Sequence, residues 1–184
     1  MNKAMALVVL AAALANSAAA GETASSVKAE RDALRGRIYA ALGEIRDAAK
    51  RASISNVILS AIADYERQAK KNPLLPELMV AGLKADEQVQ ELMREVDERM
   101  KKGGDSAGLE EKIWNLRMEQ RRAAREIEEI VRDTPGLAGW RKSSEALQAE
   151  WRNRVISDEL MNLLMREGIL CNKYLFLLHC EGRR

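Results

Sequence analysis

The sequence predicts an all-α protein: an elongated helical bundle of four to five helices with a central antiparallel, coiled-coil-like hairpin. Apolar residues recur every three or four positions over most of the chain, which is the spacing of one helix face. Charged residues make up 32% of the 184 residues and aromatic residues only 4%, a composition typical of long helices packed along narrow apolar seams. No segment shows the alternation of a half-buried strand.

Helical spacing begins near the N-terminus and is expected over residues 25–71. The motif SIS at residues 53–55 suggests a kink or a break between two helices. Asn72 is followed by Pro73, and proline disfavours helical geometry in the residue before it. We therefore expect this segment to end there.

The hairpin is expected over residues 77–132. The motif KKGGDSAG supplies its turn, because glycines end one helix and Asp105 or Ser106 can cap the next. The second helix carries the most regular heptad pattern of the chain. Its outer face alternates in charge sign, which is typical of a solvent-exposed helix rather than of a nucleic-acid site.

The last long helix is predicted over residues 140–167, after a break at Pro135 and before Gly168, since glycine commonly ends helices. Trp140 and Trp151 are eleven positions apart on this helix and therefore lie on one side of it. They either supply the large side chains of a thin core or form an exposed anchor pair for a partner protein.

Residues 169–184 are interpreted as an apolar tail that contains both cysteines, Cys171 and Cys180. A disulfide is the usual expectation in an exported protein. If the tail is helical, however, the thiols lie about 13 Å apart along the axis, whereas a disulfide needs Cα atoms within about 7 Å. An internal disulfide, a bridge to another chain and free thiols all stay open. The apolar run with Tyr174 and Phe176 either packs on the bundle or meets a partner or a membrane.

The N-terminus has the three parts of a secretory signal: Lys3, the apolar residues 5–15 and small residues at 18–20. We expect a signal peptide over residues 1–20, a helical bundle over 21–168, and a location in the periplasm or outside the cell. The apolar stretch is shorter than the about 20 residues of a membrane span. No stable membrane span is therefore expected after its removal.

Side chains suited to catalysis or metal binding are few. The single histidine, His179, lies beside Cys180, with only Glu181 as an acidic neighbour. These residues form no evident catalytic triad, and with Cys171 they match no common zinc spacing. We expect no catalytic site, no metal and no cofactor, with an enzyme using His179 as the remaining alternative. The 30 basic and 28 acidic residues are nearly balanced, which gives no reason to expect nucleic acid.

Three motifs follow one another within residues 38–164: ADYERQAKKNP, then Gly103 and Gly104, then DTPGLAGWRKSSEAL. In this order they resemble the YlbF/YmcA family of small helical bacterial proteins. In that family a helix ends before an Asp/Asn-Pro, a hairpin with a glycine tip follows, and a second break leads into a last helix.

The resemblance implies a helical fold and a non-enzymatic regulator that assembles with partners, in some members within complexes governing RNA processing and development. Some members are reported with iron–sulfur clusters, whereas the two cysteines here are too few for a four-cysteine cluster. The family is cytosolic, and this chain adds a secretion signal and an N-terminal helix. We therefore expect the fold to transfer and the RNA-linked role not to transfer.

Together these features favour an exported, non-enzymatic interaction protein that acts by self-association or by contact with a partner protein. Its alanine-rich stripes are narrow, and further helices would bury more apolar area. The alternative is a periplasmic holdase-type chaperone with helical arms. Methionines would then provide its adaptable apolar surface: Met79, Met93, Met100 and Met118.

Overall fold

The computed structural model describes residues 22–182. Over that range the chain forms six α-helices, one short 3-10 helix and no strand. The predicted all-α class is confirmed, with six helices where four to five were expected. The predicted signal peptide, residues 1–20, lies outside the described residues and stays a prediction. In chain order the elements are α2 (Ala24–Gly43), α3 (Ala48–Lys71), α4 (Leu74–Lys101), α5 (Ala107–Asp133), η2 (Pro135–Leu137), α6 (Ala138–Arg152) and α7 (Asp158–Glu181).

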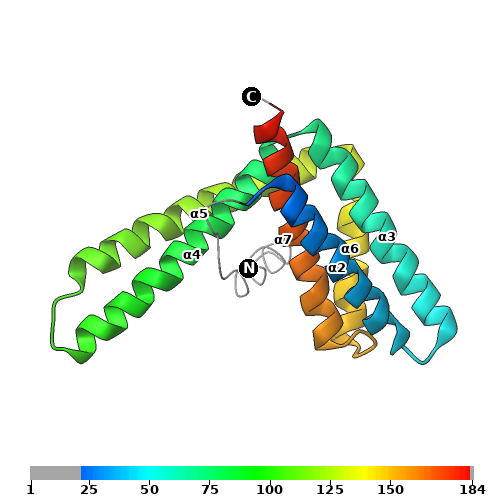
Figure 1. The fold of residues 1–184 in the computed structure, drawn as a ribbon, viewed down its shortest axis with the longest axis horizontal. Coiled ribbons are helices and arrows are strands. Elements are labelled where there is room, and N and C mark those ends of the chain that lie inside the picture. Colours follow the sequence, from blue (N-terminus) through cyan, green and yellow to red (C-terminus); the bar gives the residue numbers. More distant parts are fainter. Residues whose placement is uncertain (1–21, 183–184) are drawn as a thin grey trace.

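The helices form two parts, which we call the body and the arm (Figure 1). The body consists of α2, α3, α6 and α7, with α2 packed along α7 and α3 packed along α6. The arm is the antiparallel hairpin of α4 and α5, which projects away from the body. The base of the arm contacts α7 and η2. The molecule therefore has the shape of a V whose limbs meet at that base (Figure 1).

The arm contains the predicted hairpin, and both helices extend slightly beyond the expected residues 77–132. Gly103, at the tip, has a φ of 70°, a left-handed conformation that glycine adopts without strain. Asp105 accepts a hydrogen bond from the amide of Ala107 (3.0 Å). This bond satisfies one of the amides left unpaired at a helix start.

The first break in the chain lies at residues 44–47, so the break suggested at residues 53–55 was wrong. Asp47 accepts hydrogen bonds from the amides of Ala49 and Lys50 and begins α3. The SIS motif lies inside α3, with Ile54 buried. Burial of that side chain outweighs the modest preference of serine for helix ends.

The C-terminal half differs most from the prediction. The expected helix over residues 140–167 is two helices, because α6 ends at Arg152 and α7 begins at Asp158. Arg154 has a φ of 58°, and Ser157 caps α7 by accepting a hydrogen bond from the amide of Leu160 (3.1 Å). α7 then continues through Gly168, so residues 169–181 belong to a body helix and are not a separate tail.

Two clusters of buried side chains hold the fold together. The first lies among α2, α3 and α7 and includes Ile58 and Leu160. The second joins the body to the base of the arm, through Tyr65 of α3, Leu75 of α4 and Leu175 of α7. Each fully buried aliphatic side chain contributes about 1.5–3 kcal/mol. The arm is thus attached by a compact apolar joint at one end.

Candidate functional site

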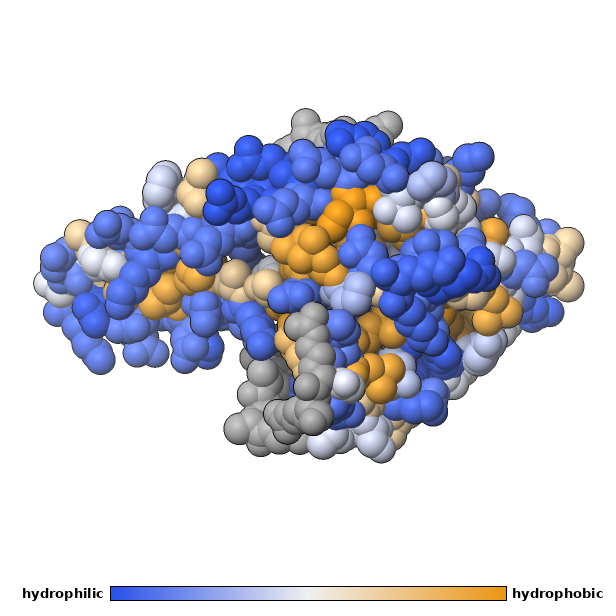
Figure 2. Space-filling view, turned by 90° about the horizontal axis from the view of Figure 1, so that it is seen from above, coloured by the Kyte–Doolittle hydropathy of each residue, from blue (hydrophilic) through white to orange (hydrophobic). Residues whose placement is uncertain are grey.

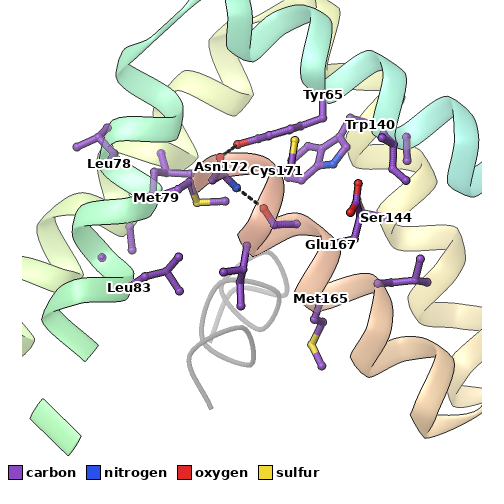
Figure 3. Close-up of a pocket in the computed structure, with 18 of the residues that line it drawn as sticks. Tyr65, Leu78, Met79, Leu83, Trp140, Ser144, Met165, Glu167, Cys171 and Asn172 are labelled. Atoms are coloured by element: carbon purple, nitrogen blue, oxygen red, sulfur yellow. Dashed lines mark hydrogen bonds between the residues drawn. The ribbon is translucent and has the colours of Figure 1, made fainter. Parts of the chain in front are cut away.

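A cleft of about 530 Å³ lies between the arm and the body. Its volume is in the range of known ligand pockets. Apolar side chains from α3, α4, α6 and α7 make up most of its surface. They include Ile62, Tyr65, Met79, Leu83, Trp140, Leu164 and Met165. Figure 3 shows several of them converging from facing helices, and Figure 2 shows apolar residues gathered where the arm meets the body.

Two glycines line the cleft from opposite walls, Gly82 on α4 and Gly168 on α7. A Cβ added to either would meet nothing within 4 Å. Packing within the fold therefore does not require glycine at these positions. Glycine inside a helix is less favourable than alanine by up to about 1 kcal/mol. The two residues leave open space at the surface of the cleft.

A buried ion-pair network lies behind the α7 wall. Arg31 and Arg35 of α2 both pair with the same carboxylate oxygen of Glu167, at N–O distances of 2.7 and 3.0 Å. Both arginines also pair with Glu66 of α3. The side chains of Arg31 and Glu167 are 4% and 3% exposed. Partial burial acts to raise the pKa of Glu66, but the two arginines outweigh it and hold that pKa below its ordinary value. The network ties three body helices together.

The second carboxylate oxygen of Glu167 has no hydrogen-bond partner. It is buried, and Glu167 itself lines the cleft. On the opposite wall, Asp86 of α4 accepts a hydrogen bond from Gln120 of α5 (3.2 Å) through one oxygen, while its other oxygen is buried without a partner. A buried acceptor without a donor is unfavourable by about 1–3 kcal/mol. Two residues of the lining, Glu167 and Asp86, therefore each hold a covered carboxylate oxygen that has no donor.

The end of the cleft near the second buried cluster is closed by a hydrogen-bonded chain. The Tyr65 hydroxyl donates to Asn172 (2.5 Å), and the Asn172 amide donates to the carbonyl of Gly168 (2.8 Å), as the dashed lines in Figure 3 show. Burial raises the pKa of Tyr65, and it raises the pKa of the Cys171 thiol to about 12. Both groups stay protonated near neutral pH, so neither is activated as a nucleophile.

The α5 side of the cleft is basic. Arg117 and Arg121, one helical turn apart, line the cleft and are exposed. Within residues 22–182 neither forms an ion pair, and their side chains approach only the sulfur atoms of Met93 and Met118. Their charges are available to a bound molecule.

The four aromatic residues for which partner binding was one of the alternatives lie in different places. Trp140 lines the cleft, and its ring centroid lies 5.3 Å from that of Tyr65, with the two ring planes tilted by 44°. Trp151 instead packs on the first buried cluster and donates a hydrogen bond to Asp158 (2.7 Å). The two tryptophans therefore do not form one exposed pair.

Tyr174 and Phe176 are half-buried on α7 and do not line the cleft. The Arg31 guanidinium lies 6.0 Å from the Tyr174 ring, and the ammonium of Lys84 lies 5.8 Å from the Phe176 ring. Both aromatic side chains thus contact their own bundle.

The internal disulfide between Cys171 and Cys180 does not form. Both thiols are free, and both lie on α7, where nine residues of helix separate them by about 13 Å along the axis. His179, on the same helix, has a buried ring nitrogen without a partner and does not line the cleft. The described residues contain no cluster of three or more metal-ligating side chains.

No helix within residues 22–182 has the length and apolar character needed to cross a membrane.

Sequence reasoning missed the cleft and the exposed Trp114 on α5, which is 62% exposed. Two signals pointed to the cleft: Asp86 interrupts an apolar seam, and Gly82 places a residue without a side chain on the same seam. Trp114 could have been found from the heptad phase, because it follows the inward residue Ile113 directly.

No family model, no characterised protein and no solved structure matches this chain.

Proposed function

We propose that this protein is an exported, non-enzymatic interaction protein that holds an apolar segment of a partner protein in the cleft between arm and body. The observation that carries the proposal is the cleft itself, which has a volume of about 530 Å³, is lined largely by apolar side chains and lies between two parts of the molecule. Soluble proteins seldom expose a concave apolar surface of this kind unless it binds something.

The chemistry of the cleft supports binding rather than catalysis. Its tyrosine and cysteine have raised pKa values and stay protonated, and Glu167 is already paired with two arginines. The sequence pattern of residues 1–20 supports export. The YlbF/YmcA resemblance, in which proteins act by assembly with partners, supports a binding role as well.

Site-specific photo-cross-linking in the native host tests the proposal. A photoreactive amino acid is placed at Leu83 on the α4 wall or Leu164 on the α7 wall, and at exposed Lys50, outside the cleft, as the control. We expect both walls to link to one contiguous segment of the same protein, and Lys50 to link to none of it. Cross-links to the same mixture of proteins from all three positions would contradict the proposal.

A holdase-type chaperone is the second candidate, and the surface of the arm favours it. Met93, Met100 and Trp114 are 41%, 63% and 62% exposed there, and methionine-rich surfaces adapt to varied clients. The test is suppression of aggregation of a reduced model client. A triple change of these residues to glutamine should remove the suppression, and a client that aggregates equally with and without the unchanged protein would rule the holdase out.

A further inference from the structure

We infer that the occupant of the cleft is an amphipathic α-helix of the partner protein, about three turns long, with acidic residues along the flank that faces α5. This inference rests on the proposed function and specifies the chemistry of the partner.

The length of the occupant follows from the walls. The cleft is lined along α7 from Met161 to Asn172 and along α5 from Arg117 to Ile127. At 1.5 Å per residue both walls are about 15 Å long, which corresponds to about three turns of a helix lying beside them. An amphipathic helix that lays its apolar face into a hydrophobic groove is a common mode of peptide recognition.

The small residues of the walls specify a close approach. Gly82 and Gly168 line the cleft, and a Cβ added to either would meet nothing within 4 Å. Ala61, Ala123 and Ala124 line it as well. Axial separation between packed helices decreases when the residues at the contact are small. A bound helix can therefore lie close to the backbone of both α4 and α7.

Two carboxylates of the lining favour one polar feature of the occupant. The Glu167 side chain is 3% exposed and one of its oxygens is covered and has no donor, and Asp86 on α4 likewise has one covered oxygen without a donor. The network of Arg31, Arg35, Glu66 and Glu167 balances two positive against two negative charges. An occupant reaches the Glu167 oxygen only when that side chain turns toward the cleft, and a neutral donor, a hydroxyl or an amide side chain, is then sufficient.

The basic rim specifies the flank. Arg117 and Arg121 are four positions apart and have no carboxylate partner among residues 22–182. Carboxylates spaced by one turn on the occupant can pair with both. Complementary charge of this kind orients a partner and selects against basic segments.

The test uses two synthetic helical peptides of about five turns, long enough to overhang the cleft at both ends. Both carry an alanine and leucine face with one central glutamine; one has glutamates along a single flank and the other has lysines there. Binding to the mature protein is measured by fluorescence anisotropy. We expect the acidic peptide to bind at least about tenfold more tightly than the basic one.

Two sets of variants assign the binding to the cleft. The change Arg117→Glu with Arg121→Glu should reverse the preference, whereas Arg122→Glu with Arg125→Glu, on exposed residues of α5 that do not line the cleft, should leave it. Gly82→Leu with Gly168→Leu should abolish peptide binding.

Gly36→Leu, at an exposed helix position with equally open space, is the control for the leucine substitutions. Circular dichroism and thermal unfolding confirm that each variant is folded before its binding is compared.

Equal binding of both peptides, or binding unaffected by the leucine substitutions, overturns the inference. If neither peptide binds but Leu83 and Leu164 still cross-link to one partner segment, the inference is wrong and the proposed function stands. If the cleft takes only a small apolar dye, the occupant is a small molecule, and both are wrong. A dimer that Arg117→Glu with Arg121→Glu dissociates would identify a second copy as the occupant and also overturn the inference.

Discussion

The body and the arm bury their side chains very differently. The body helix α7 buries residues on several sides, ten in all, including Glu167 and Asn172. The arm helices α4 and α5 are longer, at 28 and 27 residues, yet bury four and three residues. Most of the fold's cohesion therefore lies in the body and in the joint, and the arm depends on a single seam.

This difference explains where binding surface is available. Helix α7 packs against several neighbours and keeps free mainly its surface along the cleft, whereas the arm helices pack chiefly along each other and leave most of their remaining surface to solvent. The cleft forms at the boundary, where the exposed inner side of the arm faces the apolar side of the body. The four experiments below test this contrast, from the largest expected effect to the smallest.

Truncation of a core side chain should give the clearest difference between body and arm, measured as the loss in the free energy of unfolding. The change Leu160→Ala, at a body position that is 1% exposed, should lower the free energy of unfolding by about 3–4 kcal/mol. The change Ile113→Ala, in the seam between the arm helices, should lower the free energy of unfolding by about 2 kcal/mol, because two solvent-exposed helices can move together and fill the space left by the side chain. Urea unfolding measures both, with exposed Leu59→Ala as the control. Equal losses at Leu160 and Ile113 would contradict the contrast.

Removal of one partner of an ion pair should likewise lower stability more in the body than in the arm. Arg31→Met leaves buried Glu167 with only Arg35, and we expect a loss of about 3 kcal/mol. Arg99→Met breaks an arm pair with Glu95, whose side chains are 50% and 45% exposed, and should change stability by less than about 0.5 kcal/mol. Double-mutant cycles with Glu167→Gln and Glu95→Gln measure the two coupling energies. A larger coupling in the arm would refute the assignment.

Acid should weaken the body through Glu66. Its pKa in the folded protein is below the ordinary value of 4.5, so its charged form is favoured by folding. The stabilisation is present above about pH 4.5 and is lost as the pH falls through the lowered folded pKa. The free energy of unfolding, measured by urea titration at several pH values, should decrease over that range. Glu66→Gln should flatten this part of the profile, while Glu95→Gln, in the arm, should not.

Thiol reactivity offers a probe that does not alter stability. Buried Cys171, with its pKa raised to about 12, should react with iodoacetamide only after unfolding, and half-buried Cys180 should react sooner. A cysteine introduced as Met100→Cys, on the exposed end of the arm, should react fastest. Mass spectrometry follows the three rates. Cys171 reacting as fast as Met100→Cys would show that the α7 interior is accessible.

The sequence was sufficient for the helical class and for the hairpin, because both depend on local patterns. The heptad from Leu109 and the glycines near residue 103 specify two helices and a reversal within one stretch of chain. The ends of other helices were misplaced where burial outweighed local preference. Gly168 is an example: Glu167 and Ile169 beside it are buried, and packing carries the helix past a residue that usually ends one.

Local patterns gave only partial signals of the cleft, at Asp86 and Gly82, and none of the ion-pair network in its lining. Arg31 and Glu167 are 136 positions apart, and each looks like an ordinary surface charge when read along its own helix. Their burial follows from how α2 packs on α7, which no local spacing encodes. The cysteines show the opposite case, since helical geometry alone was enough to argue against their disulfide, and the structure leaves both thiols free.

The attachment of the arm at one end has a mechanical consequence. With 28 residues in α4, the arm reaches about 40 Å from its joint. A rotation of about 10° around Leu75 and Leu137 would move the tip by about 7 Å on this length, while the joint itself shifts far less. A small repacking at the joint can thus move the tip of the arm a long way toward the body or away from it.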